Sequence, residues 1–160
     1  MKNIDILILN TEEAEQFLGK EAPHIPIEDV TEEVCGKVVP FYESVERVYQ
    51  HDVRELGNDF LAMGVKQVVI TDGQRGAHIF DIKKNHYHIV TKKDLCVSTL
   101  GAGDAFSVGC VSALLEGRTT PELLQWGSIC ATNVVKEFGA QHGYVEKQGL
   151  EREVSELKKN

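Results

Sequence analysis

A run of small residues that leads into an acid is the segment best suited to chemistry. Gly101, Ala102 and Gly103 precede Asp104, and an apolar segment with helical spacing follows. Small residues let backbone N–H groups turn toward one point, and a helix that begins there adds unpaired N–H groups and the positive end of its dipole. The segment therefore predicts a site for a phosphate or for developing negative charge. Asp104 is placed to take a proton from a hydroxyl that attacks a phosphoryl group.

The same residues also have a purely structural interpretation. Gly-Ala-Gly suits a tight turn, and an aspartate in a first helical turn is ordinary helix chemistry. From the residues alone, both interpretations stay open.

Two further segments place polar residues after an apolar run. Asn10 follows residues 4–9 and has Glu13 three positions on, which predicts a capping box at the start of a helix. Residues 71–76, Thr-Asp-Gly-Gln-Arg-Gly, predict the glycine turn of a hairpin, in which Arg75 either contacts phosphates or is a solvated turn arginine. The sequence contains neither a Rossmann fingerprint nor a P-loop with its lysine.

The segment Gly101-Ala102-Gly103-Asp104-Ala105-Phe106 resembles the signature of the ribokinase-like, or PfkB-type, carbohydrate kinases. The resemblance implies that Gly101, Ala102 and Gly103 form an anion hole and that Asp104 is the catalytic base. The usual Asp-Thr-Thr before the first glycine is Ser98-Thr99-Leu100 here. In many members that aspartate helps to hold a monovalent cation, so the resemblance does not extend to this cation.

A strand followed by Asn10-x-x-Glu13 resembles the family motif whose asparagine and glutamate act near the phosphates and Mg²⁺. They do so largely through water, in keeping with the hydration that magnesium retains in proteins. The resemblance thus implies Asn10 and Glu13 as residues near ATP and Mg²⁺, a role compatible with the capping box.

The remaining nucleotide contacts are implied by two later segments. Thr71, Gly73 and Gly76 match the family's Thr-x-Gly-x-x-Gly loop, which lines the nucleotide site. Ser128 and Gly139 fall where the family has its C-terminal nucleotide wall, with Ser128 placed near the adenine by spacing alone.

The resemblance implies an ATP-dependent phosphotransferase that moves the γ-phosphate of ATP to a hydroxyl of a small, sugar-like substrate. The alternative is a non-catalytic nucleotide-binding half, or a regulatory module, that needs a partner chain to bind substrate. The missing sugar-binding half and the altered Ser98-Thr99-Leu100 favour the alternative.

Alternating strand-like and helix-like segments predict one three-layer α/β/α domain over residues 1–160 with a mostly parallel sheet. Members of the family are much longer, and the resemblance covers their C-terminal half without the N-terminal half and lid. A parallel sheet cut in this way leaves an apolar edge strand and uncovered helix faces. We therefore expect a homo-oligomer or association with a complementary N-terminal half.

The predicted elements follow from hydrophobic periodicity and turn residues. His86 and His88 fall on one face of a strand, and the pattern favours a solvated face over a metal site. The elements comprise strands at 4–9, 67–71 and 86–90, helices at 10–19, 28–38, 43–63, 105–115 and 121–138, and a fraying helix from 146.

Composition narrows the classes of partner. The net charge of −8 argues against nucleic acid, and no apolar run is long enough for a membrane helix. The acidic N-terminus does not resemble a signal peptide, and four widely spaced cysteines indicate reduced, buried thiols. These features predict a cytoplasmic protein.

Overall fold

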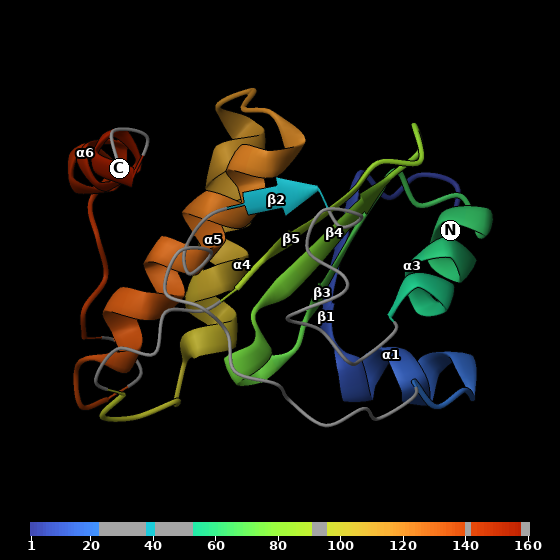
Figure 1. The fold of residues 1–160 in the computed structure, drawn as a ribbon, viewed down its shortest axis with the longest axis horizontal. Coiled ribbons are helices and arrows are strands. Elements are labelled where there is room, and N and C mark those ends of the chain that lie inside the picture. The colour runs from blue at the N-terminus through green and yellow to red at the C-terminus, as the bar shows by residue number, and fades with distance from the viewer. Residues whose placement is uncertain (23–37, 41–52, 91–95, 140–141, 158–160) are drawn as a thin grey trace.

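The computed structural model describes residues 1–22, 38–40, 53–90, 96–139 and 142–157. Its centre is a five-stranded sheet in the order β1-β3-β4-β5-β2, with helices on both faces (Figure 1). This confirms the predicted three-layer α/β arrangement. The strands are β1 (Ile6–Asn10), β2 (Val38–Pro40), β3 (Gln67–Thr71), β4 (Ala77–Asp81) and β5 (His86–Ile89).

The helices divide between the two faces of the sheet, with α1 and α3 on one side and α4, α5 and α6 on the other (Figure 1). Successive side chains of a strand point to opposite faces of the sheet, so each strand contributes to both cores. Val69 and Ile79 pack toward α4 and α5. Val68 and Ile70 pack toward α1 and α3. The helices are α1 (Thr11–Leu18), α3 (Arg54–Ala62), α4 (Ala102–Leu115), α5 (Thr120–Val135) and α6 (Lys147–Leu157), with a short 3₁₀ turn η2 (Gly73–Arg75).

The mostly parallel sheet that we predicted is wrong for the described strands. Only β1 and β3 pair in parallel there; the β3–β4, β4–β5 and β5–β2 pairs are antiparallel. The physical reason is connection length, because short hairpins join β3 to β4 and β4 to β5 and leave no room for a crossover helix. In the second hairpin, the Asp81 carboxylate accepts hydrogen bonds from the backbone amides of Lys83 (2.9 Å) and Asn85 (3.0 Å).

The strand predicted at residues 4–9 is β1, and it is half-buried rather than fully buried along Ile6–Leu9. It lies at one end of the described sheet, with β3 beside it. The described sheet thus ends in an apolar edge strand, at a segment that the sequence predicted as a buried strand.

The helix predicted at 43–63 is described only in part: α3 runs from Arg54 to Ala62, and residues 41–52 lie outside the described part of the chain. The predicted helix at 28–38 also lies outside it, apart from Val38, which begins a strand. The helix predicted from residue 146 is α6, and its Leu150 and Val154 side chains are buried in the core on the α4 and α5 side.

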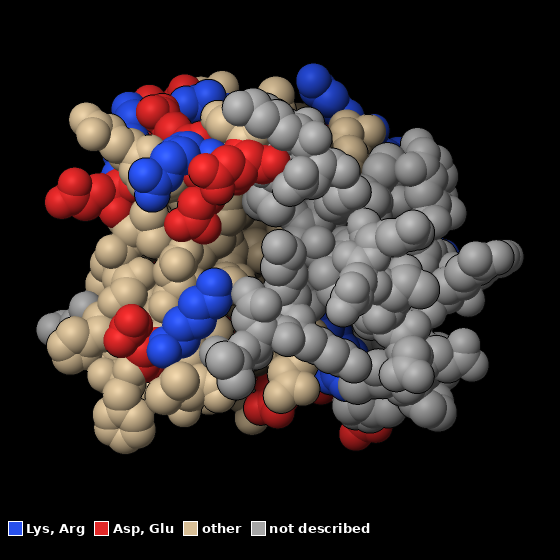
Figure 2. All heavy atoms as spheres, turned by 60° about the vertical axis from the view of Figure 1, so that its left-hand side comes forward, with Lys and Arg blue, Asp and Glu red and all other residues tan. Residues whose placement is uncertain are grey.

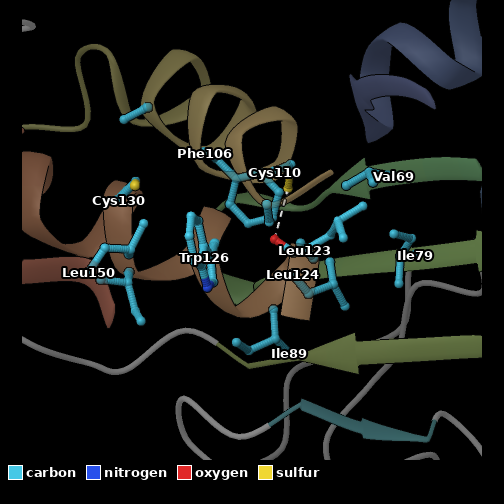
Figure 3. Close-up of a cluster of buried hydrophobic side chains, with 14 of the residues drawn as sticks. Val69, Ile79, Ile89, Phe106, Cys110, Leu123, Leu124, Trp126, Cys130 and Leu150 are labelled. Atoms are coloured by element: carbon cyan, nitrogen blue, oxygen red, sulfur yellow. Dashed lines mark hydrogen bonds between the residues drawn. The ribbon is translucent and has the colours of Figure 1, made fainter. Parts of the chain in front are cut away.

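That core is built around the α4–α5 pair (Figure 3). Trp126 is only 2% exposed and lies within it, as a core position rather than a stacking platform. The Cys110 thiol donates to the carbonyl of Leu123 at 3.2 Å. Cys110 and Cys130 are buried as expected, and burial raises the pKa of the Cys130 thiol to about 11. Cys96 is exposed, contrary to expectation.

Charges on the surface are mixed. On the face drawn in Figure 2, Lys and Arg side chains of the described residues lie beside Asp and Glu side chains. Two such pairs join α6 to the α4–α5 connection, namely Lys147 with Glu116 at 2.6 Å and Arg118 with Glu151 at 3.0 Å. Across the ranges that the structure describes, none of the helices is long and apolar enough to span a bilayer.

Candidate active site

The N-terminus of α4 is open to solvent. Gly101 occupies the N-cap position with φ 82°, a left-handed conformation that glycine adopts without strain, and no described side chain caps this end of the helix. The first intrahelical hydrogen bond runs from the Ala105 amide to the Gly101 carbonyl at 2.9 Å. The amides of Gly103 and Asp104 therefore lie in the first turn, where a helix offers N–H groups without intrahelical acceptors.

This end of α4 differs from the starts of α1 and α5. Both of those helices begin with a capping box, formed by Asn10 with Glu13 and by Thr119 with Glu122. They satisfy early amides with their own side chains, whereas α4 leaves such amides available to an anion.

Gly103 lies in open space. A Cβ at this position would meet no other atom of the described chain within 4 Å, so packing does not require glycine here. Glycine in a helix costs about 0.5–1 kcal/mol relative to alanine. The missing side chain leaves open space beside the exposed Asp104.

Asn10 and Glu13 are joined in the predicted capping box. The Asn10 side chain accepts from the Glu13 amide at 2.8 Å, and the Glu13 carboxylate accepts from the Asn10 amide at 2.8 Å. Asn10 pairs in register with Thr71 at the carboxyl ends of the parallel strands β1 and β3. In α/β folds, ligands bind at this edge of the sheet.

The turn after β3 is held by an ion pair. Asp72 is 7% exposed, and its carboxylate accepts two hydrogen bonds from the Arg75 guanidinium, both at 2.8 Å. Arg75 is therefore not the solvated turn arginine of one sequence interpretation. The Asp72 amide donates to the Gly76 carbonyl at 2.8 Å, which closes the loop.

The two glycines of this loop have different surroundings. Gly73 is exposed at the start of η2, and a Cβ there would meet none of the described atoms within 4 Å. Gly76 is buried with φ 100°, and a Cβ there would collide with the Ile89 carbonyl oxygen. Gly76 thus holds the loop against β5, while Gly73 faces outward with the loop backbone.

The segment before α4 is tied to the end of α5. The amides of Val97 and Ser98 both donate to the Val135 carbonyl, at 2.8 and 3.2 Å. The Ser98 hydroxyl accepts from the Leu100 amide at 3.2 Å, so the residue that replaces the family's aspartate stabilises a local turn.

Figure 1 shows α1, η2 and the start of α4 at one edge of the sheet. The carboxyl ends of β1 and β3, where Asn10 pairs with Thr71, therefore lie at the same end of the sheet as the start of α4.

Ser128 and Gly139, which were predicted for the C-terminal nucleotide wall, belong to α5 and to the segment after it. Gly139 lies just beyond the end of α5. Ser128 is half-buried within α5, where its neighbour Gly127 packs against Phe106 of α4. Ser128 is thus set beside the α4–α5 contact, while Gly139 follows the helix end that holds Val97 and Ser98.

Three histidines near the loop were missed or misplaced by sequence reasoning. We expected His86 and His88 on a solvated face, but His88 is fully buried and His86 is half-buried. His78 on β4 is also fully buried and pairs in register with His88. The sequence did contain a signal for this pairing. Histidines fall at alternate positions of the second strand, and His78 lies on the facing strand of the same hairpin. Burial lowers the pKa of His88 to about 4, although the Arg75 carbonyl and the Asp72 charge act in the opposite direction.

Comparison with known proteins identifies the family. The family model described as pfkB family carbohydrate kinase matches residues 1–148. The chain belongs to this family. It is 28% identical over 107 residues to an uncharacterised sugar kinase from Archaeoglobus fulgidus, in an alignment that covers 66% of this chain and 42% of that protein.

Solved structures confirm the ribokinase-like fold. An Arabidopsis thaliana ribokinase, solved with ribose and ATP, matches 94% of this chain with a TM-score of 0.69 and 22% identity. An Escherichia coli protein described as a ribokinase II, solved with ATP and Mg²⁺, matches 95% with a TM-score of 0.67 and 19% identity. The chain covers 41% and 39% of these two structures, so it spans less than half the length of these relatives.

One feature of the described residues suits a phosphate group. The start of α4 is uncapped, and Gly103 in its first turn is exposed. Among the described residues, no group of three or more His, Cys, Asp or Glu side chains is arranged to hold a metal ion.

Proposed function

We propose that this chain carries the nucleotide-binding and catalytic part of an ATP-dependent phosphotransferase that acts on a hydroxyl of a small, sugar-like molecule. One observation supports it above the others: the start of α4 is uncapped and exposed, and Asp104 lies in its first turn. Membership of a carbohydrate kinase family supports phosphoryl transfer as the chemistry of this geometry.

In the proposed reaction, Asp104 accepts the proton of the substrate hydroxyl as its oxygen bonds to the γ-phosphorus. The bond between that phosphorus and the oxygen bridging to the β-phosphate breaks, and ADP leaves with the electron pair. The backbone amides of Gly101–Gly103 would stabilise the charge on the phosphoryl group in transfer. Positioning and electrostatics would thus supply most of the rate acceleration.

The remaining site residues bind the nucleotide in this proposal. Thr71, Gly73 and Gly76 shape the loop at its phosphates, and Ser128 with Gly139 form the opposite wall. Asn10 and Glu13 would contact Mg²⁺ through water, and the metal would neutralise charge on the β- and γ-phosphates.

Asp104→Asn tests the assigned base. We expect turnover to fall by about 10²- to 10⁴-fold, because the amide cannot accept the proton, while the dissociation constant of Mg·ATP changes little. A coupled assay of ADP release with a panel of sugars measures turnover, and calorimetric titration measures binding. Asp5→Asn is the matched control, since Asp5 is an exposed acid before β1 that pairs with Lys66. Full activity of Asp104→Asn would exclude the assigned base.

A second candidate function is a nucleotide-binding module that needs a partner to complete the substrate site. It is favoured by the exposed apolar side chains of α4, where Val108, Val111 and Leu115 recur at helical spacing. Among the described strands, β1 pairs only with β3, so its other side is open to strand addition within this part of the chain.

The two candidates differ in a simple measurement. Binding of Mg·ATP with no turnover of any sugar would favour the module. Turnover by the purified chain would favour a complete site, in which case sedimentation should show association between copies. A monomer at all concentrations that nevertheless turns over would exclude the need for a partner.

A further inference from the structure

Three histidines form a stacked cluster on one face of the β4–β5 hairpin. His78 stacks on His88 with ring centroids 4.5 Å apart, and its Nδ1 lies 2.9 Å from Nε2 of His86. His86 in turn stacks on Phe80, with ring centroids 4.0 Å apart. The register of the two strands accounts for the cluster, since His78 lies opposite His88 and Phe80 opposite His86.

One end of this cluster contacts the turn after β3. The His88 Nε2 atom lies 3.4 Å from the carbonyl oxygen of Arg75. Because a carbonyl can only accept, Nε2 carries the proton and donates. Burial keeps the ring neutral near pH 7, with a single N–H to give, so this contact fixes the tautomer.

A second contact joins the same turn to β5. Gly76 packs directly on the Ile89 carbonyl, next to His88 in that strand. The Asp72–Arg75 pair stiffens the turn internally, but both residues belong to the turn itself. His88 and Gly76 therefore help to set where residues 72–76 lie relative to β5.

We propose that His88 is a positioning residue for the nucleotide. It holds the backbone of residues 72–76 in the position relative to β5 that lets this turn contact the phosphates of ATP. This inference rests on the proposed function, in which that turn lines the nucleotide site. His88 itself would not touch the ligand, because it is fully buried beneath the turn.

A pair of variants separates positioning from packing. His88→Leu fills a similar volume without a donor and removes the hydrogen bond from the imidazole to the Arg75 carbonyl. His88→Gln keeps an amide N–H near the position of Nε2. We expect His88→Leu to weaken Mg·ATP binding by about three- to tenfold, the size of one neutral hydrogen bond, and His88→Gln to restore most of it. Titration calorimetry measures both.

His86→Gln is the matched control, since His86 belongs to the same cluster but contacts His78 and Phe80 rather than the turn. Its affinity for Mg·ATP should match that of the unaltered chain. Equal binding by the unaltered chain and a folded His88→Leu variant would overturn the inference, as would equal losses in His88→Leu and His86→Gln.

Hydrogen exchange provides a readout that needs no nucleotide. The Arg75 and Gly76 amides are hydrogen-bonded within the turn, to the carbonyls of Asp72 and Gly73 at 3.0 and 3.2 Å. Their exchange should speed up in His88→Leu and not in His88→Gln. If the unaltered chain binds no ATP, the proposed function fails, yet this result still decides whether His88 holds the turn. Unchanged exchange in His88→Leu would refute that role.

Discussion

Acid should destabilise this protein through the buried imidazole of His88. Burial lowers the pKa of His88 from 6.5 to about 4, whereas in the unfolded chain the imidazole regains its ordinary value. Between these two pH values the unfolded chain binds a proton that the folded chain does not. Stability therefore rises with pH through this window and, as far as His88 is concerned, is constant above about pH 6.5.

The size of the effect follows from the two pKa values. Each unit of difference corresponds to about 1.4 kcal/mol, so the loss should be about 2 kcal/mol at pH 5 and about 3 kcal/mol at pH 4. Against a total stability of roughly 5–15 kcal/mol for a domain, this loss is readily measured.

Urea unfolding followed by circular dichroism, at half-unit steps from about pH 7.5 to about pH 4.5, provides the assay. The free energy of unfolding of the unaltered chain should fall across this range, and that of His88→Gln should fall much less. Parallel profiles for the unaltered chain and His88→Gln would refute the reasoning.

Two glycine-to-alanine changes should have opposite effects on stability. Gly103→Ala should stabilise the fold by about 0.5–1 kcal/mol, since alanine favours the helix and its Cβ meets no described atom. It should also weaken Mg·ATP binding, because the added methyl group would occupy space beside Asp104 where we propose that the phosphates bind. Thermal melts with and without Mg·ATP measure both effects, and unimpaired nucleotide binding would contradict that placement of the phosphates. Gly76→Ala should destabilise the fold by about 2 kcal/mol or more, because its backbone is left-handed and its Cβ would collide with the Ile89 carbonyl oxygen. An unchanged urea midpoint for Gly76→Ala would show that the turn can shift away from β5.

Sequence reasoning succeeded where the interacting groups lie close together in the chain. The capping box of Asn10 and Glu13 spans three residues, so its geometry follows once the helix forms. The Gly19 end of α1, in a left-handed conformation with φ 64°, is equally local. For the same reason, the segment around Asp104 could be recognised as a helix start from its composition alone.

Sequence reasoning failed where the structure depends on which strands pair with each other or on which elements cover a face of the sheet. A strand pattern of apolar residues is the same in parallel and antiparallel pairs, so the direction of β4 and β5 was decided by hairpin length instead. Histidine on alternate positions indicates a polar face when nothing covers it, yet His78 and His88 are fully buried. The C-terminal helix looked like a charged tail because Leu150 and Val154, one turn apart on its buried face, stand among charged residues.

The contrast among helix starts bears most directly on function. The capping boxes at α1 and α5 show that caps form readily in this fold, and each contributes about 1 kcal/mol. At α4 the chain instead has glycine at the N-cap, glycine in the first turn and an exposed acid beside them. Glycine inside the first turn lowers the stability of a helix relative to alanine, and packing at Gly103 does not require it. We propose that this helix start, at the end of the sheet where Asn10 and Thr71 also end their strands, is the anion site of the proposed function. Its amides would be held in place by the helix and would stay available to the phosphate.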